Sequence, residues 1–234
     1  MNQFSRTELL IGKEGIEKLK EAKVAIFGLG GVGSYVAEGL VRAGVGNFVL
    51  IDNDEVSITN INRQIIATTK TVGMSKVEVA KKRIQEINPK AIVQIFKTFY
   101  MPGMGGIIKK DINYIVDAID TVTAKIGLIE EANTMNIPII SCMGTGNKLN
   151  PCMLEVADIY KTEVCPLAKT MRKELRKRDI KKLKVVYSKE EPVEQYETGE
   201  IEYKGKTKVP GSVSFVPSVA GMIIASEVVK DLIK

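Results

Sequence analysis

The chain has 234 residues, 44% of them hydrophobic and 26% charged, and a formal net charge of +6. A chain of this length and balance can bury a full core as an ordinary globular protein, and no apolar run approaches the ~20 residues that cross a bilayer. Because histidine is absent, the composition excludes a histidine general base, a Ser-His-Asp triad and histidine metal ligands.

The first predicted elements form a strand, a turn, a helix and a second strand. An amphipathic segment over residues 15–22 comes first, and the apolar run 24–27 predicts a strand. A glycine-rich turn, GLGGVG, then leads into a helix predicted over residues 32–43, and residues 48–51 form the second strand. This order predicts the nucleotide-binding unit of a parallel sheet.

The glycines of this turn have separate uses. Gly28 can take a backbone conformation that is barred to residues with a Cβ, and Gly33 lets the helix lie close to the strand. Gly30 and Gly31 let a phosphate approach the backbone, where the first amides of the helix favour an anion. Asp52 follows the second strand, where an acidic side chain can accept hydrogen bonds from ribose hydroxyls. The pattern predicts a bound nucleotide and leaves its identity open.

A polar segment, residues 54–64, follows where a plain strand–helix alternation would continue. It supplies carboxylates, amides and a guanidinium, among them Asp54, Asn60 and Arg63. A dehydrogenase has little need of these groups just beyond the ribose. A site that binds a triphosphate does need them. Lys76 lies in the first turn of the next predicted helix, where a lysine is unfavourable for the helix dipole, so we expect it to have an anionic partner.

The remaining elements alternate as in a doubly wound fold. We predict strands over residues 92–96, 114–118, 137–142, 154–159 and 185–188, and helices over residues 102–110, 123–136, 164–179 and 218–233. The strand over residues 114–118 leads to Asp120, and the carboxyl ends of parallel strands meet at one edge of the sheet. We therefore expect Asp52 and Asp120 to converge on one crevice.

Positive charge gathers in the second half of the chain. Between residues 161 and 189, eleven basic residues stand against three acidic ones. Such a field attracts polyanions, although the charge alone is equally compatible with a solvated helix face. The stretch over residues 189–209 is polar and acidic and predicts an exposed loop or hairpin.

Together these elements predict a Rossmann-like, doubly wound α/β fold with a mainly parallel sheet and a smaller C-terminal α+β extension. Residues 1–145 would form a nucleotide-binding core. Residues 146–234 would form a basic substrate-binding extension that packs back on the core in a single compact unit.

The N-terminal residues and the cysteines bear on localisation. The first residues lack a basic start followed by an apolar core, so we expect no secretory signal. The three cysteines are isolated, with no CxxC pair, which favours a reducing cytoplasm and argues against a Cys-rich structural zinc site.

Several separated motifs together resemble a known family. In chain order they are Arg6, the GLGGVGS turn at residues 28–34, Asp52, Asp54, the NINRQ motif at residues 60–64, Lys76 and Asp120. This order resembles the family that adenylates carboxylates, named for ubiquitin-activating enzymes and their bacterial sulfur-carrier relatives. Further motifs are similar to the branch of that family that dehydrates threonylcarbamoyl-adenosine in tRNA. They lie at residues 4–8 (FSRTE), 158–162 (DIYKT), 166–169 (PLAK) and 185–188 (VVYS).

The resemblance implies a role for each matched residue, in a site that takes ATP and Mg²⁺. The nucleotide would be held by Gly28, Gly30, Gly31, Gly33, Asp52, Asp54, Asn60, Arg63 and Lys76. Arg63 and Lys76 would balance charge as pyrophosphate leaves, and Asp120 would hold the metal. Arg6, the fourth expected catalytic residue, would reach into the site of a partner subunit, which implies a homodimer with shared sites.

The resemblance also implies the substrate and the reaction. ATP would convert the threonine carboxylate of the tRNA base into a mixed anhydride with AMP, which the neighbouring carbamoyl group would attack. Tethering both groups on one base removes the need for a strong protein base, which suits a chain without histidine. The tRNA backbone would contact the basic helix through Lys169, Arg172, Lys173, Arg176, Lys177 and Lys181. No membrane is expected to be a partner, and a sulfur-relay protein remains open as one.

Two other functions compete with this interpretation. An adenylating activator of a small ubiquitin-like or sulfur-carrier protein would share these residues, but such enzymes usually carry CxxC zinc ligands and a thioester-forming cysteine. A nicotinamide oxidoreductase would rest on the glycine turn alone. Cys165 stands where relatives of the dehydratase type often have an acidic residue, so we assign it no catalysis. Cys142 and Cys152 are expected to be packed or incidental thiols.

Overall fold

Strands and helices alternate along the computed structural model, which describes residues 2–196 and 209–234. The strands are β1 (Lys23–Phe27), β2 (Asn47–Ile51), β3 (Ile92–Phe96), β4 (Tyr114–Asp117), β5 (Ile139–Cys142), β6 (Leu154–Asp158) and β7 (Lys184–Ser188). The helices are α1 (Ser5–Glu21), α2 (Gly33–Ala43), α3 (Lys76–Ile87), α4 (Val122–Thr134), α5 (Pro166–Arg176) and α6 (Phe215–Leu232). Short 3₁₀ helices are η1 (Ile58–Asn60), η2 (Pro151–Met153) and η3 (Ile159–Lys161).

The described strands form one seven-stranded sheet in the order β3-β2-β1-β4-β5-β7-β6. All neighbours pair in parallel except β6, which runs antiparallel to β7. The chain moves outward from β1 to β3 in one direction and from β4 in the other, so the strand order reverses between β1 and β4. Ligands of doubly wound sheets bind at this reversal, outside the carboxyl ends of the strands. The topology confirms the predicted doubly wound, mainly parallel fold.

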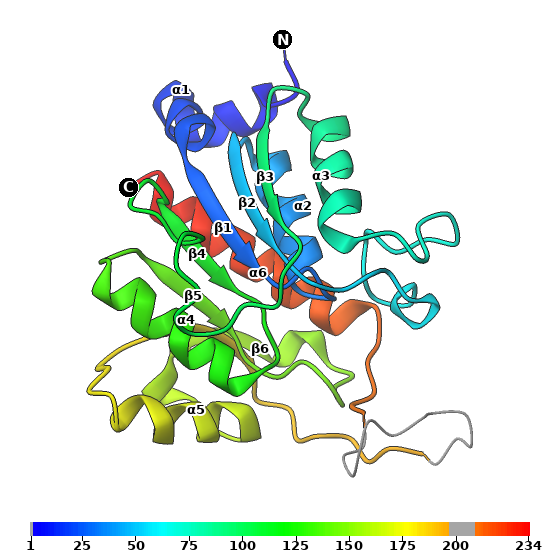
Figure 1. The fold of residues 1–234 in the computed structure, drawn as a ribbon, viewed down its shortest axis with the longest axis vertical. Coiled ribbons are helices and arrows are strands. Elements are labelled where there is room, and N and C mark those ends of the chain that lie inside the picture. Colours follow the sequence, from blue (N-terminus) through cyan, green and yellow to red (C-terminus); the bar gives the residue numbers. More distant parts are fainter. Residues whose placement is uncertain (1, 197–208) are drawn as a thin grey trace.

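Helices cover both faces of the sheet (Figure 1). Helices α2, α3 and α6 pack on one face, and α4 and α5 lie on the other. β1 has the alternation that two covered faces require. Val24 and Ile26 belong to the apolar cluster with α2 and α6, whereas Ala25 and Phe27 belong to the cluster with α4. All four side chains are buried, as expected for a central parallel strand.

The last helix, α6, packs directly on α2, the helix that follows the glycine turn. A Cβ at Gly221 would lie 2.5 Å from the backbone oxygen of Val32, and a Cβ at Gly39 would lie 2.8 Å from the Cβ of Ala225. Only glycine permits this approach of the two helices. Because β6 and β7 also extend the same sheet, residues after position 145 share one sheet and one core with those before it.

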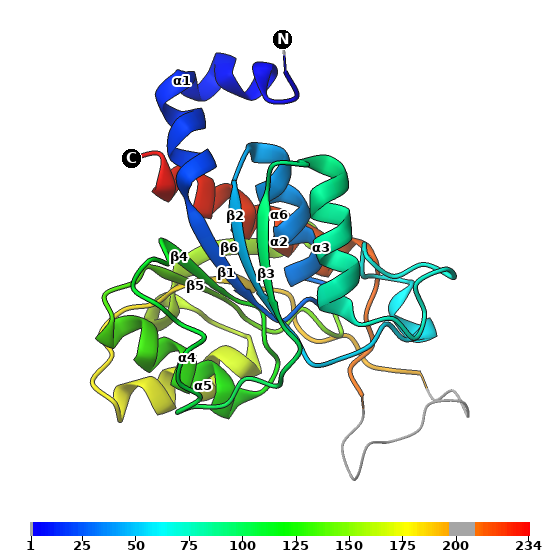
Figure 2. The ribbon, with the colours of Figure 1, turned by 45° about the horizontal axis from the view of Figure 1, so that its top comes forward.

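Helix α1 lies beyond the amino ends of the strands and projects from the rest of the molecule (Figure 2). Gly12 interrupts the helix with a left-handed φ of 71°. Leu9 and Leu10 lie in its first half and are 85% and 88% exposed. Among the helices of the described residues, none combines the length and apolarity needed to span a membrane.

One predicted helix is wrong. Residues 102–110 fold as turns instead, because Gly103 and Gly106 adopt φ values of 83° and 91°, which an α-helix does not contain. Pro102 packs against α4, where a Cβ at Gly127 would lie 2.3 Å from its Cγ. Packing on α4 therefore decides the shape of this segment.

Two helices differ from prediction in their first residues. The basic helix begins two residues later than predicted, since Val164 has a left-handed φ of 61°. The last helix begins at Phe215 rather than at residue 218, because the first turn of a helix tolerates Pro217. Of the loop or hairpin predicted over residues 189–209, residues 197–208 lie outside the described residues.

Candidate active site

The glycine turn joins β1 to α2 at the carboxyl edge of the sheet. Gly28 has a left-handed φ of 87°, and a Cβ there would lie 2.6 Å from the backbone oxygen of Ala118. A Cβ at Gly33 would lie 1.8 Å from the backbone oxygen of Gly28. Neither position has room for a side chain, so the turn lies tight against the loop that follows β4. The first amides of α2 point at this turn and favour an anion there.

Asp52 connects the glycine turn to the end of β2. Its Oδ2 accepts a hydrogen bond from the backbone N–H of Leu29 at 2.7 Å, and its Oδ1 accepts one from Asp54 at 2.8 Å. The carboxylate is half-buried and keeps lone pairs that can accept from a ribose hydroxyl.

Lys76 has the anionic partner that its place in a first helical turn predicts, and this partner is Asp54. The Lys76 Nζ lies 2.7 Å from Asp54 Oδ2, and the backbone N–H of Lys76 donates to the Asp54 carbonyl at 3.0 Å. The side chain of Lys76 is 6% exposed and that of Asp54 57%. Because an ammonium has three donors, Lys76 can bind a phosphate oxygen while it keeps Asp54.

Arg63 and Gln64 pack on the middle of the glycine turn. A Cβ at Gly31 would lie 3.4 Å from Arg63 Cγ, and a Cβ at Gly30 would lie 3.9 Å from Gln64 Nε2. Asn60 shapes this segment, because its carbonyl accepts the backbone N–H groups of both residues, at 3.0 and 2.9 Å. Its side-chain Oδ1 also accepts, at 3.0 Å, a hydrogen bond from the backbone N–H of the residue directly before η1.

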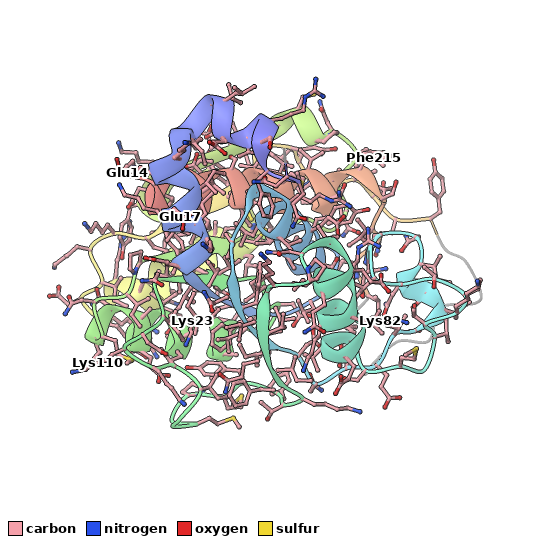
Figure 3. The ribbon with its side chains drawn as sticks, turned by 90° about the horizontal axis from the view of Figure 1, so that it is seen from above. Glu14, Glu17, Lys23, Lys82, Lys110 and Phe215 are labelled. Atoms are coloured by element: carbon pink, nitrogen blue, oxygen red, sulfur yellow. The ribbon has the colours of Figure 1, made fainter. Side chains whose placement is uncertain are left out.

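The start of α6 closes the same end of the molecule. A Cβ at Gly31 would lie 3.1 Å from the Cβ of Pro217, and Asn62 Nδ2 donates to the backbone oxygen of Ser212 at 2.9 Å. Figure 3 labels Phe215 at the start of α6, at the same end as the segment 53–75, drawn in cyan. The turn is therefore enclosed by residues far apart in the sequence.

Two polar groups here lack what a ligand could supply. Gln64 is 5% exposed, and its Oε1 has no hydrogen-bond partner within the described residues. Burial lowers the pKa of the Arg63 guanidinium, an effect that an adjacent anion would oppose. Gln64 was not among the predicted site residues, although the NINRQ motif contains it. An unsatisfied buried oxygen costs about 1–3 kcal/mol, which a bound donor would offset.

Asp120 lies in the loop between β4 and α4. Its carboxylate is exposed, and among the described residues its one side-chain contact is with the Thr121 hydroxyl at 3.3 Å. The N–H of Ala118, in the same loop, donates to Phe27 at the end of β1 at 2.9 Å. Asp120 thus follows β4 and the glycine turn follows β1, at the point where the strand order reverses. Its oxygens are open to a cation.

A cation at this edge would depend on ligands from the nucleotide. Across residues 2–196 and 209–234, no group of three or more His, Cys, Asp or Glu side chains is placed to hold a metal. Mg²⁺ in nucleotide sites commonly takes one or two carboxylates, with phosphate and water oxygens completing its octahedron. One exposed carboxylate beside a phosphate-binding turn fits that requirement.

A buried ion pair lies behind the Asp120 loop and was not predicted. Lys125 Nζ lies 2.9 Å from Asp117 Oδ2, and both side chains are 0% exposed. A signal was present in the sequence. Lys125 stands between Ala124 and Ile126 in the apolar first half of α4, and a lysine so placed must be paired.

Arg6 lies apart from these residues. It is exposed on α1, at the amino edge of the sheet, whereas the glycine turn follows the carboxyl end of β1 (Figure 1). Within the described part of one chain, the structure brings together the other predicted nucleotide-site residues but not Arg6.

The predicted tRNA-contacting residues lie along α5 and the turn after it. α5 begins beside the carboxyl edge of the sheet, where a Cβ at Gly144 would lie 3.9 Å from Cys165 Sγ. Arg172 is half-buried and donates to the carbonyl of Thr162 at 2.9 Å. The Arg176 guanidinium lies 5.3 Å from the ring centroid of Tyr160.

The other four residues of this set are lysines, and they differ in their ion-pair partners. Lys177 Nζ lies 2.7 Å from Glu174 Oε1, and Lys181 pairs with Asp179. Lys169 and Lys173 are exposed and form no ion pair within the part of the chain that the structure describes. These two lysines hold the charge that is most available to a polyanion.

Two of the three cysteines have no accessible thiol. Cys142 and Cys165 are buried, and Cys152 is exposed. Burial raises the pKa of the Cys142 thiol to about 12, so this thiol is protonated and unreactive at neutral pH.

Comparison with known proteins defines the family. The ThiF family matches residues 4–234, and the chain belongs to this family. A tRNA threonylcarbamoyladenosine dehydratase from Bacillus subtilis is 46% identical over 243 residues, spanning 100% of this chain and 96% of that relative. Two crystal structures of the Escherichia coli tRNA N6-threonylcarbamoyladenosine dehydratase are also similar. The complex with ATP has a TM-score of 0.85 at 32% identity, and the complex with AMP has 0.85 at 31%. Each comparison covers 98% of this chain and 93% of the other. The resemblance inferred from the sequence motifs is confirmed.

Proposed function

We propose that this chain is an ATP-dependent tRNA threonylcarbamoyladenosine dehydratase, which cyclises the modified base through an adenylated carboxylate. One observation carries the proposal. A continuous set of contacts runs from the glycine turn at Leu29 through Asp52 and Asp54 to the buried ammonium of Lys76. Such a set suits a phosphorylated nucleotide, and the most extensive similarities reported above are to dehydratases of this name.

The nucleotide is ATP, bound with its phosphates on the glycine turn. The backbone at Gly30 and Gly31 is the part of the turn that phosphates approach, with Arg63 beside it. Lys76 neutralises charge that develops as pyrophosphate departs, and Asp52 accepts from the ribose. The relative crystallised with ATP and with AMP supports this choice over a nicotinamide cofactor.

Asp120 is the residue that would hold Mg²⁺. When bound, the ion supplies positive charge to the phosphate oxygens. The chain itself contributes the open carboxylate of Asp120 and the ammonium of Lys76. Asn60 contributes indirectly, because its backbone carbonyl shapes the segment that presents Arg63.

The chemistry needs no strong base from the protein. The threonine carboxylate attacks the α-phosphate of ATP, pyrophosphate leaves, and the acyl carbon carries AMP as its leaving group. The neighbouring carbamoyl group then attacks this carbon and loses a proton, and AMP departs with one of the former carboxylate oxygens. The ring closes, and the base has lost one water. Because both reacting groups belong to one base, their effective concentration is high.

α5 supplies the contact with the tRNA backbone. It begins beside the loop that follows β5, at the edge that holds the glycine turn. Its basic side chains form a row that runs along the helix away from that edge. Lys169 and Lys173 bind phosphates directly. Residues 1–145 then serve the nucleotide and residues 146–234 the tRNA, within one core, and a tRNA substrate places the enzyme in the cytoplasm.

A second copy of the chain completes the enzyme. The exposed Leu9 and Leu10 on α1 form an apolar surface that a partner subunit would cover. Arg6 lies on the same helix segment, so the dimer would bring its guanidinium to the partner's nucleotide. A sulfur-relay protein remains open as a further partner.

A nucleoside assay tests the proposal. The protein is incubated with ATP, Mg²⁺ and tRNA that carries threonylcarbamoyl-adenosine, and the tRNA is digested and analysed by mass spectrometry. We expect the modified nucleoside to lose one water only when ATP and Mg²⁺ are both present. The matched control is the same tRNA without the threonylcarbamoyl group.

The failing outcome is also specific. An unchanged nucleoside, together with ATP–pyrophosphate exchange that requires a small carrier protein, would assign the chain to carrier activation instead. Saturable NAD binding without ATP binding would select an oxidoreductase.

A further inference from the structure

The ion pair between Lys125 and Asp117 is a buried charged feature that the reaction above does not use. Both side chains are fully buried, 2.9 Å apart. Removing two charges from water costs free energy that their attraction repays only with excellent geometry, and apolar replacements of such pairs are often neutral or stabilising. Stability alone is therefore a weak reason for a charged pair at this place.

The ammonium of Lys125 contacts three different parts of the fold. Its Nζ lies 2.9 Å from Asp117 at the end of β4, and it donates to the carbonyl of Cys142 at the end of β5 at 2.8 Å. Its third acceptor is the carbonyl of Ile119, at 3.1 Å, in the loop after β4. The ammonium thus joins the carboxyl ends of two strands to the loop between β4 and α4.

Asp117 holds the other side of the same peptide segment. Its Oδ1 accepts the backbone N–H of Ile119 at 3.2 Å, and its Oδ2 accepts the hydroxyl of Ser141. Both polar backbone groups of Ile119 are therefore bonded to the ion pair. The next residue along the chain is Asp120.

Within the part of the chain that the structure describes, this loop has few other hydrogen bonds beyond Ala118. Ala118 is fastened to the end of β1 and lies against Gly28. Asp120 is exposed, and the Thr121 side chain makes no capping bond to α4. Between the fastened Ala118 and the start of α4, the ion pair supplies the hydrogen bonds to the Ile119 backbone, and the Ile119 side chain packs on the apolar cluster beneath α4.

We propose that Lys125 is a positioning residue for the active site: together with Asp117 it fixes the Ile119 peptide and thereby holds the Asp120 carboxylate at the crevice. The proposal rests on the proposed function for the identity of the ligand, Mg²⁺ with ATP. Without the ion pair the Asp120 carboxylate would be free to move, and a shift of about 1 Å in an active-site group can lower the reaction rate by about 100-fold.

Lys125→Met and the double variant Asp117→Asn/Lys125→Met test the proposal. The single variant leaves Asp117 buried and unpaired, which destabilises the fold. The double variant leaves no uncompensated charge and keeps an acceptor at position 117, yet it lacks the donor to Ile119. Lys184→Met is the matched control, because Lys184 also forms ion pairs, with Asp231 at 2.6 Å, but at the amino end of β7.

Two readouts separate positioning from general loosening of the fold. In hydrogen exchange we expect the amides of residues 119–121 to exchange about tenfold faster in the double variant, with the amides of β1 and α2 unchanged. In calorimetry we expect the gain in ATP affinity on adding Mg²⁺ to fall by about tenfold, with ATP affinity in EDTA unaltered. Lys184→Met is expected to leave both readouts at their wild-type values.

The outcomes are distinguishable from failure of the proposed function. A folded double variant with wild-type exchange at residues 119–121 and a wild-type response to Mg²⁺ would overturn the positioning role. Wild-type protein that binds no ATP would overturn the proposed function instead. In that case the exchange measurement alone still decides whether the ion pair holds the loop.

Discussion

At the glycine turn the charged side chains are held in place by one another and by backbone groups, whereas along α5 most of them stand on the surface. Lys76 is almost fully buried against Asp54, and Asp52 is tied to two backbone amides. On α5, Lys169 and Lys173 are exposed to solvent, and the exposed Lys177 is paired with the half-buried Glu174. The glycine turn therefore presents charges in a fixed geometry, whereas α5 presents a diffuse positive electrostatic field.

The difference follows from the sizes of the two proposed ligands. A triphosphate is small, so a few groups must each be placed to a fraction of an ångström, and burial with satisfied hydrogen bonds provides that rigidity. A tRNA backbone is long and repeated, so many exposed cations act on it together and each contributes little. Substitutions in the first region should therefore be severe and local, and those in the second graded and dependent on salt.

Asp120→Asn is expected to give the largest effect. Loss of the carboxylate should lower the single-turnover rate of base cyclisation by about 1,000-fold, because the amide is a poor ligand for Mg²⁺. The side chain is exposed, so the thermal unfolding temperature should not change. Asp111→Asn removes an exposed carboxylate at the amino side of β4 and should leave the rate unchanged. Wild-type activity of the Asp120 variant would remove this residue from the site.

Lys76→Ala should have the next largest effect. We expect kcat/KM for ATP to fall by about 100-fold, because the variant would lack the buried ammonium that we propose neutralises departing pyrophosphate. The control is Lys82→Ala in the same helix, whose side chain is 77% exposed and projects from the outer side of α3 (Figure 3). Equal losses in the two variants would show that the effect comes from α3 itself and not from the site.

The sequence pattern predicted the fold well because local and global requirements agree in it. Each central strand is a short apolar run, and a parallel strand buried on both faces requires such a run. The glycine turn was predictable for the same reason, since backbone conformation and contact distance allow only glycine at Gly28 and Gly33. Where packing rather than periodicity decides, prediction failed, as in the segment 102–110 against α4.

The site was predictable in its residue types and less so in its contacts. The position of Lys76 in a first helical turn indicated an anionic partner, but that partner stands 22 positions earlier and is known only from the fold. Gln64 and the pair of Lys125 with Asp117 were missed because their roles depend on burial. No local spacing tells a buried lysine from a solvated one. The apolar neighbours of Lys125 were the available clue.

In the α5 region, the double variant Lys169→Ala/Lys173→Ala should raise KM for tRNA by about tenfold at moderate salt. It should also reduce the slope of log affinity against log salt by about 2, one unit for each lost phosphate contact. KM for ATP should stay at the wild-type value. The matched control is Lys177→Ala/Lys181→Ala, whose ammonium groups are already paired with acids. An equal effect in both double variants would mean that ion pairing on α5 does not limit tRNA binding.

Glu174→Gln should give the smallest effect, and in the opposite direction. Hydrogen bonds from Lys177 and Arg178 lower the pKa of the Glu174 carboxyl, so it is ionised at neutral pH and occupies both cations. Replacing it with an amide of the same shape frees them for phosphate, and we expect tRNA affinity to rise by about twofold. An exposed ion pair contributes little to folding, so the thermal unfolding temperature should hardly move.

Removing the Asp117 carboxylate in the buried region should instead lower the stability of the fold strongly, because it leaves the Lys125 charge without a partner. Measuring unfolding and tRNA binding for Glu174→Gln and Asp117→Asn side by side would show whether the two regions differ as described. A Glu174 variant that unfolds early or binds tRNA more weakly would mean that this acid shapes α5 and does not compete with phosphate.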